Sequence, residues 1–214
     1  SWRLLYGKQG ELLCKSCHSK LRPLTQPGCR RCSRILADLP ATFIQNDCCY
    51  DCVRWEKQGS ALEKNHSLYA YNAYMKELLA LFKYRGDYAI VECFAEELRV
   101  MLSGIEADYV VPIPLSKERL HERRFNQSEA LIQAAGLLPT HLLTRTHSEK
   151  QSKKSRKHRM KPATIFQFDT HFSIKNKEII LVDDIYTTGS TLHQAAEILQ
   201  REGAKSIKSV TIAR

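Results

Sequence analysis

One strand, loop and helix near the C-terminal end constrain the fold more than any other part of the sequence. Residues 178–184, EIILVDD, form an apolar run that predicts a buried strand ending on Asp183 and Asp184. The loop YTTGST follows, and then a helical spacing of apolar residues up to Gly203: Leu192, Ala195, Ala196 and Leu199. Another apolar strand, SIKSVTIA, comes next. This strand, helix, strand order with continuous apolar runs predicts an α/β fold with a parallel sheet covered on both faces.

The preceding residues supply further elements of the same fold. Two amphipathic helices are predicted, one from Met75, Leu78, Leu79 and Phe82 with a stop near Gly86, and one from Ile90, Phe94, Leu98 and Met101. The segment DYVVPIP predicts a short buried strand over residues 108–113, followed by a loop and a helix through about Ala135. Residues 145–162 hold eight Lys/Arg against one Glu with no apolar period, which predicts a mobile loop.

The loop after the aspartates has the chemistry of a phosphate site. Ligands of open parallel sheets bind beyond the carboxyl ends of the strands, where a helix N-terminus offers free amides. The phosphate-binding residues we expect are Thr187, Thr188, Gly189, Ser190 and Thr191. Two carboxylates would repel a phosphate, so we expect Asp183 and Asp184 to accept hydrogen bonds from a ribose whose 5-phosphate lies in the loop, with room for a divalent cation. An ordinary turn with solvated aspartates is the alternative.

Basic residues at two other places are suited to further anionic groups. Lys117, Arg119, Arg123 and Arg124 follow the 108–113 strand, where a solvated helix surface is the alternative interpretation. The basic segment contains Lys153, Lys154, Arg156, Lys157 and Arg159. Three interpretations of this segment stay open: contact with a nucleic-acid backbone, a lid over pyrophosphate, or a solvated run of charge.

Taken together, these motifs resemble a known family. VDDIYTTGST is similar to the signature of type I phosphoribosyltransferases, and its combination with PIPL, RRFNQS, Gln151 and Arg159 resembles the ComF/GntX proteins over nearly the whole chain. The resemblance implies a type I phosphoribosyltransferase-like domain with Asp183 and Asp184 at the catalytic position. It also implies that the 187–191 loop holds the ribose 5-phosphate of phosphoribosyl pyrophosphate. The residues on the pyrophosphate side would be Lys117, Arg119 and Arg123.

Two positions depart from the family pattern. Arg124 stands where members usually have a glycine, and Pro162 lies near where many members have an asparagine. We expect the side chain at position 124 to crowd the pyrophosphate side.

The cysteines are paired in a way that predicts a metal site. Six of the eight form CxxC pairs: Cys14 with Cys17, Cys29 with Cys32, and Cys49 with Cys52. Two CxxC turns complete the four-thiolate set of structural zinc, and the chain lacks an export signal that would favour disulfides. Pairing of the first two CxxC turns and use of Cys48 in place of its neighbour are both open. Cys93 stands alone on a predicted helix, where we expect it to pack in the core.

The resemblance narrows the choice of zinc ligands. ComF/GntX proteins often begin with a double zinc ribbon of four CxxC pairs. This implies that Cys29, Cys32, Cys49 and Cys52 form one complete site. It also implies that Cys14 and Cys17 would pair with a CxxC preceding Ser1.

The sequence as a whole predicts a cytoplasmic protein with no membrane insertion, because no apolar run approaches the ~18 residues of a membrane helix. We expect a zinc-ribbon module over residues 1–60 and the phosphoribosyltransferase-like domain over 61–214. The formal charge of +10 favours polyanionic partners.

Three functions are compatible with the sequence. The resemblance implies a competence protein that acts on single-stranded DNA during uptake or processing, with phosphoribosyl pyrophosphate or a related sugar phosphate as ligand. Its other partners would be competence proteins such as a DNA helicase. An active phosphoribosyltransferase, with magnesium and a base or amine acceptor, is the main alternative. A sensor that binds the sugar phosphate and signals through the zinc ribbon is the third.

Overall fold

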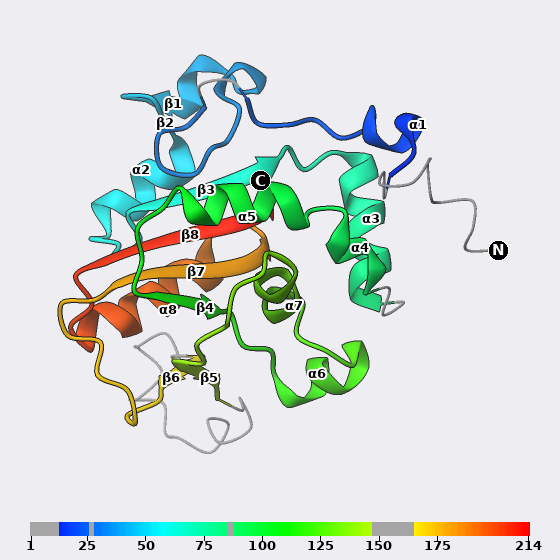
Figure 1. The fold of residues 1–214 in the computed structure, drawn as a ribbon. Coiled ribbons are helices and arrows are strands. Elements are labelled where there is room, and N and C mark those ends of the chain that lie inside the picture. The colour runs from blue at the N-terminus through cyan, green and yellow to red at the C-terminus, as the bar shows by residue number, and fades with distance from the viewer. Residues whose placement is uncertain (1–12, 26–27, 85–87, 147–164) are drawn as a thin grey trace.

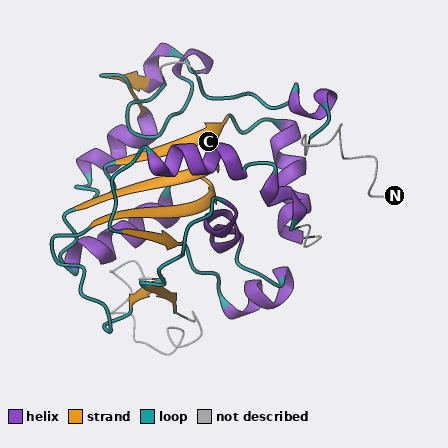
Figure 2. Cartoon of the chain, viewed as in Figure 1, coloured by secondary structure: helices purple, strands orange, loops and turns teal. Residues whose placement is uncertain are grey.

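A parallel four-stranded sheet forms the centre of the molecule (Figures 1 and 2). The computed structural model describes residues 13–25, 28–84, 88–146 and 165–214. The strands in spatial order are β3 (Lys64–Tyr69), β8 (Ser206–Ala213), β7 (Glu178–Ile185) and β4 (Tyr109–Pro112). All three neighbouring pairs are parallel. The predicted parallel α/β fold is therefore confirmed, including the strands expected at 108–113, 178–184 and 206–213.

Helices cover both faces of the sheet. On one face, α8 (Ser190–Arg201) and α2 (Tyr50–Lys57) contribute to a core that includes Ile179, Leu181 and Ile207. On the other face, a second core contains side chains of α3 (Ala73–Tyr84), α4 (Ala89–Glu92), α5 (Ala95–Ser103) and α7 (Gln127–Ala134). Figure 1 shows α5 in front of the sheet and α8 behind it. The apolar residues that predicted α3 and α8 are all buried: Met75, Leu78, Leu79, Phe82, Leu192, Ala195, Ala196 and Leu199.

Two predicted segments, one helix and one loop, differ in the structure. The helix expected from Ile90 to Met101 is divided into α4 and α5 at residues 93 and 94, and this turn lets Val91 and Phe94 both reach the core. The loop expected after β4 contains the short helix α6 (Lys117–Arg123), which Ser116 caps by accepting a hydrogen bond from the backbone N–H of Arg119 at 3.3 Å. Cys93 is half-buried at the edge of the second core.

The cysteine-rich region consists of short elements that share the core of the sheet. They are α1 (Lys15–His18), the 3₁₀ turns Leu36–Asp38 and Ala41–Phe43, and the antiparallel pair β1 (Ile44–Gln45) and β2 (Cys48–Cys49). Cys29, Cys32, Cys49 and Cys52 belong to the same buried cluster as Leu181 and Leu199. A region too small to bury a core of its own is therefore packed against the sheet.

A small antiparallel ribbon lies on either side of the basic segment in the chain. It pairs β5 (Leu143–Arg145) with β6 (Phe166–Phe168). Arg145, expected in the mobile loop, is thus part of a strand and lies opposite Phe166. The lid or nucleic-acid candidates Lys153, Lys154, Arg156, Lys157 and Arg159 lie outside the described residues, as do Gln151 and Pro162. Among the helices that the structure describes, none combines the length and apolar character needed to span a membrane.

Candidate functional site

The two aspartates at the carboxyl end of β7 have different environments. Neighbouring residues of a strand point to opposite faces, so Asp183 and Asp184 meet different partners. Asp184 is only 5% exposed and forms an ion pair with Lys83 of α3. Asp183 is half-buried, and its Oδ1 accepts hydrogen bonds from Ser128 Oγ at 3.2 Å and from the backbone N–H of Asp184 at 2.9 Å. One carboxylate is therefore neutralised by a lysine, whereas the other has only uncharged hydrogen-bond donors.

This environment changes the acidity of Asp183. Burial, followed by the negative charge of Asp184, raises the pKa of Asp183 to about 7, although its hydrogen bonds and the charge of Lys83 act in the opposite direction. The carboxyl group is therefore poised to exchange a proton near neutral pH. A group of this kind can accept a hydrogen bond from a sugar hydroxyl when ionised and donate one when protonated.

The loop after β7 has a backbone that only glycine fits. Gly189 has φ +80° and is buried, and a Cβ atom at this position would lie 2.2 Å from the hydroxyl oxygen of Tyr186. That hydroxyl is hydrogen-bonded to Nε2 of His193 at 2.8 Å, and burial lowers the pKa of His193 to about 3, so the ring is neutral. Thr187 and Thr188 are exposed, and Ser190 and Thr191 begin the twelve-residue helix α8. The loop thus places hydroxyl groups at a helix N-terminus, where the dipole favours an anion.

Arg145 carries positive charge near Asp183, and Arg119 and Arg123 lie near Arg145 in turn. Arg145 is half-buried, and its pKa is lowered by burial first and then by the charge of Arg119, with Arg123 also lowering it and Asp183 raising it. Arg145 is therefore close enough to interact electrostatically with Asp183 and with the other two arginines. Arg123 also donates a hydrogen bond to Gln127 Oε1 at 3.0 Å. Lys117 and Arg119 are exposed on α6.

Arg124, which stands where the resembled family usually has a glycine, has a backbone conformation that suits glycine. Its backbone is left-handed, with φ 70° and ψ −16°, and it caps the end of α6. Glycine adopts this conformation without strain, which accounts for the glycine that the resembled family has here. The side chain of Arg124 is exposed.

A cavity of about 510 Å³ borders the loop on the side of the cysteine-rich region. Its lining combines residues of that region, including Arg34 and Asp51, with Tyr71 and the loop residues Thr187 and Thr188. Arg34 and Asp51 form an ion pair at 3.2 Å. The space next to the loop therefore has a lining of mixed polarity and is built from distant parts of the chain.

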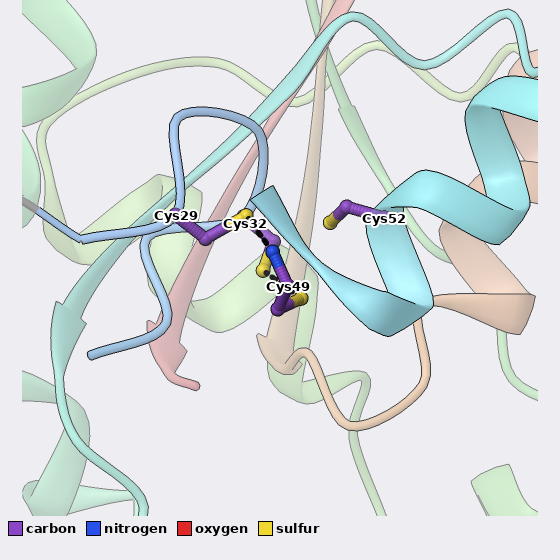
Figure 3. A group of neighbouring side chains, drawn as sticks. All are labelled: Cys29, Cys32, Cys49 and Cys52. Carbon is purple, nitrogen blue, oxygen red and sulfur yellow. Dashed lines mark hydrogen bonds between the residues drawn. The ribbon is translucent and has the colours of Figure 1, made fainter. Parts of the chain in front are cut away.

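Four cysteines form a compact buried cluster (Figure 3). The Sγ atoms of Cys29, Cys32, Cys49 and Cys52 all lie within 4.8 Å of one another. The Cys32 and Cys49 sulfurs are 3.6 Å apart. A tetrahedral zinc with Zn–S bonds of ~2.3 Å separates its sulfurs by about 3.8 Å, so the donor set and its spacing fit a zinc ion. The four cysteines that the resemblance implied as metal ligands therefore lie together in the structure.

The other cysteines are not part of this cluster. Pairing of Cys29 and Cys32 with Cys14 and Cys17 is wrong, because β2 and α2 bring the third CxxC to the second. Cys48 does not replace Cys49, since its sulfur instead accepts a hydrogen bond from Arg30 Nε at 3.2 Å. Cys14 and Cys17 lie at α1, where a hydrogen bond with Ser16 is the largest of the effects that lower the pKa of Cys14 to about 7.

Several residues near the site escaped sequence reasoning. Lys83, Ser128 and Arg145 lie far from the acidic motif in the sequence, and Lys83 and Arg145 carry no motif of their own. Ser128 stands within RRFNQS, so this motif gave the one available signal.

Comparison with known proteins agrees with the fold. A family model described as a phosphoribosyl transferase domain matches residues 138–214. Competence protein ComFC of Bacillus subtilis is 40% identical over 222 residues, covering 100% of this chain and 89% of that protein. Competence protein ComFC of Streptococcus pneumoniae is 31% identical and covers 99% of this chain and 91% of its own length. The DNA utilization protein YhgH of Escherichia coli is 31% identical over 47% of each chain. With a phosphoribosyltransferase domain, a buried four-cysteine cluster and this similarity over nearly the full length, the chain belongs to the ComFC family of competence proteins.

Proposed function

We propose that this chain is a competence protein that binds a phosphorylated ribose of the phosphoribosyl pyrophosphate type and handles single-stranded DNA in the cytoplasm during uptake. One observation carries the ligand part of the proposal. The half-buried Asp183 lies next to a hydroxyl-rich loop at a helix N-terminus and within electrostatic range of Arg145, which in turn interacts with Arg119 and Arg123. An acid between two anion-binding regions is suited to a sugar that carries a phosphate at each end.

In this proposal each part of the ligand has its own partner. The 5-phosphate takes hydrogen bonds from the amides and hydroxyls of residues 187–191, and Asp183 binds the ribose hydroxyls. The pyrophosphate faces Arg119, Arg123 and Arg145, with Lys117 at the rim. Magnesium would accompany the pyrophosphate, since hard cations bridge carboxylates and phosphates. Asp184 supports the site through its ion pair with Lys83.

The cysteine cluster is proposed to hold a structural zinc within a module of residues 1–60, against a ligand-binding domain of residues 61–214. Four thiolates close the coordination shell, so the metal would contribute stability and leave no position for a substrate. Cys14 and Cys17 would bind a second zinc only together with ligands from another segment.

The DNA part of the proposal is supported by the relatives and by charge. Two relatives are named competence proteins and a third a DNA utilization protein. The formal charge of +10 favours a polyanion, and the basic segment contributes much of it. Other competence proteins, such as a DNA helicase, are the protein partners that this role would require.

Thermal unfolding tests the ligand claim. Magnesium with phosphoribosyl pyrophosphate should raise the melting temperature, because a ligand at 100 times its Kd stabilises the folded state by about 2.7 kcal/mol. Asp183→Asn combined with Asp184→Asn should abolish the shift. Asp108→Asn is the matched control, since Asp108 lies before β4 and pairs with Lys177 at 2.8 Å. An unchanged wild-type melting curve at millimolar ligand would reject the claim.

Salt dependence of DNA binding tests the second claim. Each phosphate contact to single-stranded DNA adds about 0.7 to the slope of log K against log salt. Replacing Lys153, Lys154, Arg156, Lys157 and Arg159 by alanine should therefore lower that slope by up to about 3.5. If the slope is unchanged while affinity for phosphoribosyl pyrophosphate falls, the segment is a lid over the ligand and does not bind DNA.

A transferase reaction is the second candidate, and the match of residues 138–214 to a phosphoribosyl transferase domain is the observation that favours it. Catalysis would depend on positioning and on stabilising the charge of the departing pyrophosphate. Pyrophosphate release with a panel of bases and amines would establish it. If no pyrophosphate is released and DNA binding depends on salt, the transferase function is rejected and the competence function stands.

A further inference from the structure

One buried arginine joins the cysteine cluster to the phosphate loop. Arg214 follows β8, and its side chain is only 6% exposed. Its Nε donates a hydrogen bond to Cys32 Sγ at 3.2 Å, and its Nη2 donates to Cys49 Sγ at 3.9 Å. Its Nη1 donates to the backbone carbonyl of Thr187 at 2.6 Å and to that of Tyr186 at 3.3 Å. The guanidinium group therefore contacts two metal-ligand candidates and two loop carbonyls at once.

Electrostatics explain why this arginine lies where it does. A buried guanidinium needs negative charge and hydrogen-bond acceptors to offset its lost hydration. Four thiolates around a divalent cation carry a net charge of about −2. Asp51 adds a carboxylate 3.9 Å from Nη2, and the ring of Tyr186 lies 4.8 Å from the guanidinium carbon. The N–H donors of a guanidinium group are fixed in one plane, so one edge of the Arg214 guanidinium faces the sulfurs while another faces the loop.

A tryptophan makes a second link of the same kind. Trp55 lies one helical turn after Cys52 on α2. Its Nε1 donates a hydrogen bond to the backbone carbonyl of Thr188 at 2.8 Å. Its ring stacks on His193 of α8, with centroids 4.1 Å apart and planes at 15°. The cysteine-bearing helix therefore contacts both the loop and the helix that follows it.

These contacts orient the loop backbone. Three successive carbonyls, those of Tyr186, Thr187 and Thr188, accept hydrogen bonds from Arg214 or Trp55. The described residues contain no cis peptide bond, and in a trans peptide the N–H points away from the C=O. The N–H groups of residues 187, 188 and 189 are therefore directed away from the cysteine side. This is the arrangement that an anion-binding loop requires.

We propose that Arg214 is a positioning residue, assisted by Trp55, through which the metal-bound cysteine cluster holds the phosphate loop in its anion-binding conformation. The proposal rests on the function proposed above and deepens it. Metal loading and affinity for the phosphorylated ribose are then coupled, and thermodynamic linkage makes the coupling reciprocal. Loss of the metal frees the four sulfurs from their fixed arrangement, so Arg214 loses its sulfur acceptors and the loop carbonyls lose their donor.

The test uses the full chain with its metal bound. The variants are Arg214→Met, Arg214→Lys, Trp55→Phe, which keeps the stacked ring but removes the donor, and Arg201→Met as an exposed control on α8. Calorimetric titration with magnesium phosphoribosyl pyrophosphate should show at least tenfold weaker binding for Arg214→Met, with zinc content unchanged. Arg214→Lys should recover part of the affinity, Trp55→Phe should lose severalfold, and Arg201→Met should match the wild type. Wild-type affinity in Arg214→Met with zinc retained would overturn the proposal.

Hydrogen exchange separates this proposal from the ligand claim. Without any ligand, amides 187–190 should exchange faster in Arg214→Met, in Trp55→Phe and in the wild type after chelation of the metal, while amides of β4 stay protected. Unchanged exchange in the loop would refute the coupling, whether or not the metabolite binds. If Arg214→Met does not fold, Trp55→Phe and chelation decide by the same measurement. Faster exchange in a protein that never binds the metabolite would leave the coupling standing and reject the ligand.

Discussion

The two anion-binding sides of the site are built in opposite ways. The phosphate loop is fixed from behind: Gly189 is enclosed by Tyr186 and His193, and Arg214 and Trp55 hold the carbonyls. The arginine side consists of side chains, of which Arg119 is exposed and Arg145 half-buried. The loop therefore offers defined backbone geometry, whereas the arginines offer charge with little fixed geometry.

This difference assigns separate tasks to the two sides. A preorganised loop binds a small phosphate with little loss of entropy, which gives affinity and a fixed position. Long cationic side chains adapt to a larger and more variable group such as pyrophosphate, and their effect depends on salt. We expect changes in the loop to act on folding and binding together, and changes in the arginines to act on binding alone.

Gly189→Ala should have the largest effect, because it breaks the loop itself. The added Cβ meets the Tyr186 hydroxyl and the backbone is left-handed, so we expect a loss of stability on the order of 3 kcal/mol and no ligand binding. Gly136→Ala is the matched control, with φ +79° and nothing within 4 Å of its Cβ. It should cost only about 1 kcal/mol. Equal losses in urea unfolding would show that the loop is not enclosed.

Asp183→Asn tests the residue that lies between the two sides. The pKa of Asp183 in the folded protein, about 7, is above the ~3.9 of an unfolded aspartate, so the folded state binds more protons between these values. Stability must fall as pH rises through this window. Asparagine removes this loss, and the variant should exceed the wild type by up to a few kcal/mol at pH 8, with the gain shrinking toward pH 4.

The control for this pH effect is Asp108, an aspartate whose pKa is shifted in the opposite direction. Hydrogen bonds from Lys177 and from the backbone of Glu178 lower the pKa of Asp108, so its contribution grows as pH rises above the unfolded value. Asp108→Asn should therefore lose stability at pH 8 where Asp183→Asn gains it. Thermal melts of both variants from pH 4 to 8 decide the matter, and a gain for Asp183→Asn that does not change with pH would contradict the assignment.

Arg119→Gln and Arg145→Gln weaken the arginine side. Each should lower affinity for phosphoribosyl pyrophosphate about tenfold, or ~1.4 kcal/mol, at low salt and less at high salt. Ribose 5-phosphate, which lacks the pyrophosphate, should bind the variants and the wild type alike. Arg99→Gln is the control, since Arg99 is exposed and pairs with Glu96 at 2.6 Å on α5. Equal losses for both ligands would place the arginines at the 5-phosphate instead.

Arg124→Gly should have the smallest effect, and it should raise stability. Glycine relieves the left-handed backbone at the end of α6, and we expect a gain of up to about 1 kcal/mol, or ~2–4 °C in melting temperature. Arg124→Ala removes the charge but keeps the strain, so it should not stabilise. A similar gain in both variants would attribute the effect to charge.

The sequence predicted the parts of this fold whose buried faces are apolar. Strands β4, β7 and β8 and helices α3 and α8 follow directly from such runs. Strand β3 escaped because its buried side chains include Asn65 and Ser67, which are satisfied by hydrogen bonds with Ser209 and Thr211 of β8. A polar network between two strands has no periodic signal in either sequence.

The site was predictable where its chemistry lies in one segment. The acidic pair and the loop are consecutive, and the CxxC spacing gave the cysteine cluster. The residues that tune the site come from elsewhere: Lys83 of α3 pairs with Asp184 of β7, and Arg214 lies 182 positions from Cys32. Such contacts depend on the tertiary fold and on no local pattern.

A crystal structure of the chain with magnesium and phosphoribosyl pyrophosphate tests the central claim most directly. We expect the 5-phosphate to lie against the amides and hydroxyls of residues 187–191, the ribose hydroxyls to bind Asp183, and the pyrophosphate to face the three arginines. A ligand phosphate bound at the arginines with the loop empty, or a sugar that does not touch Asp183, would contradict it.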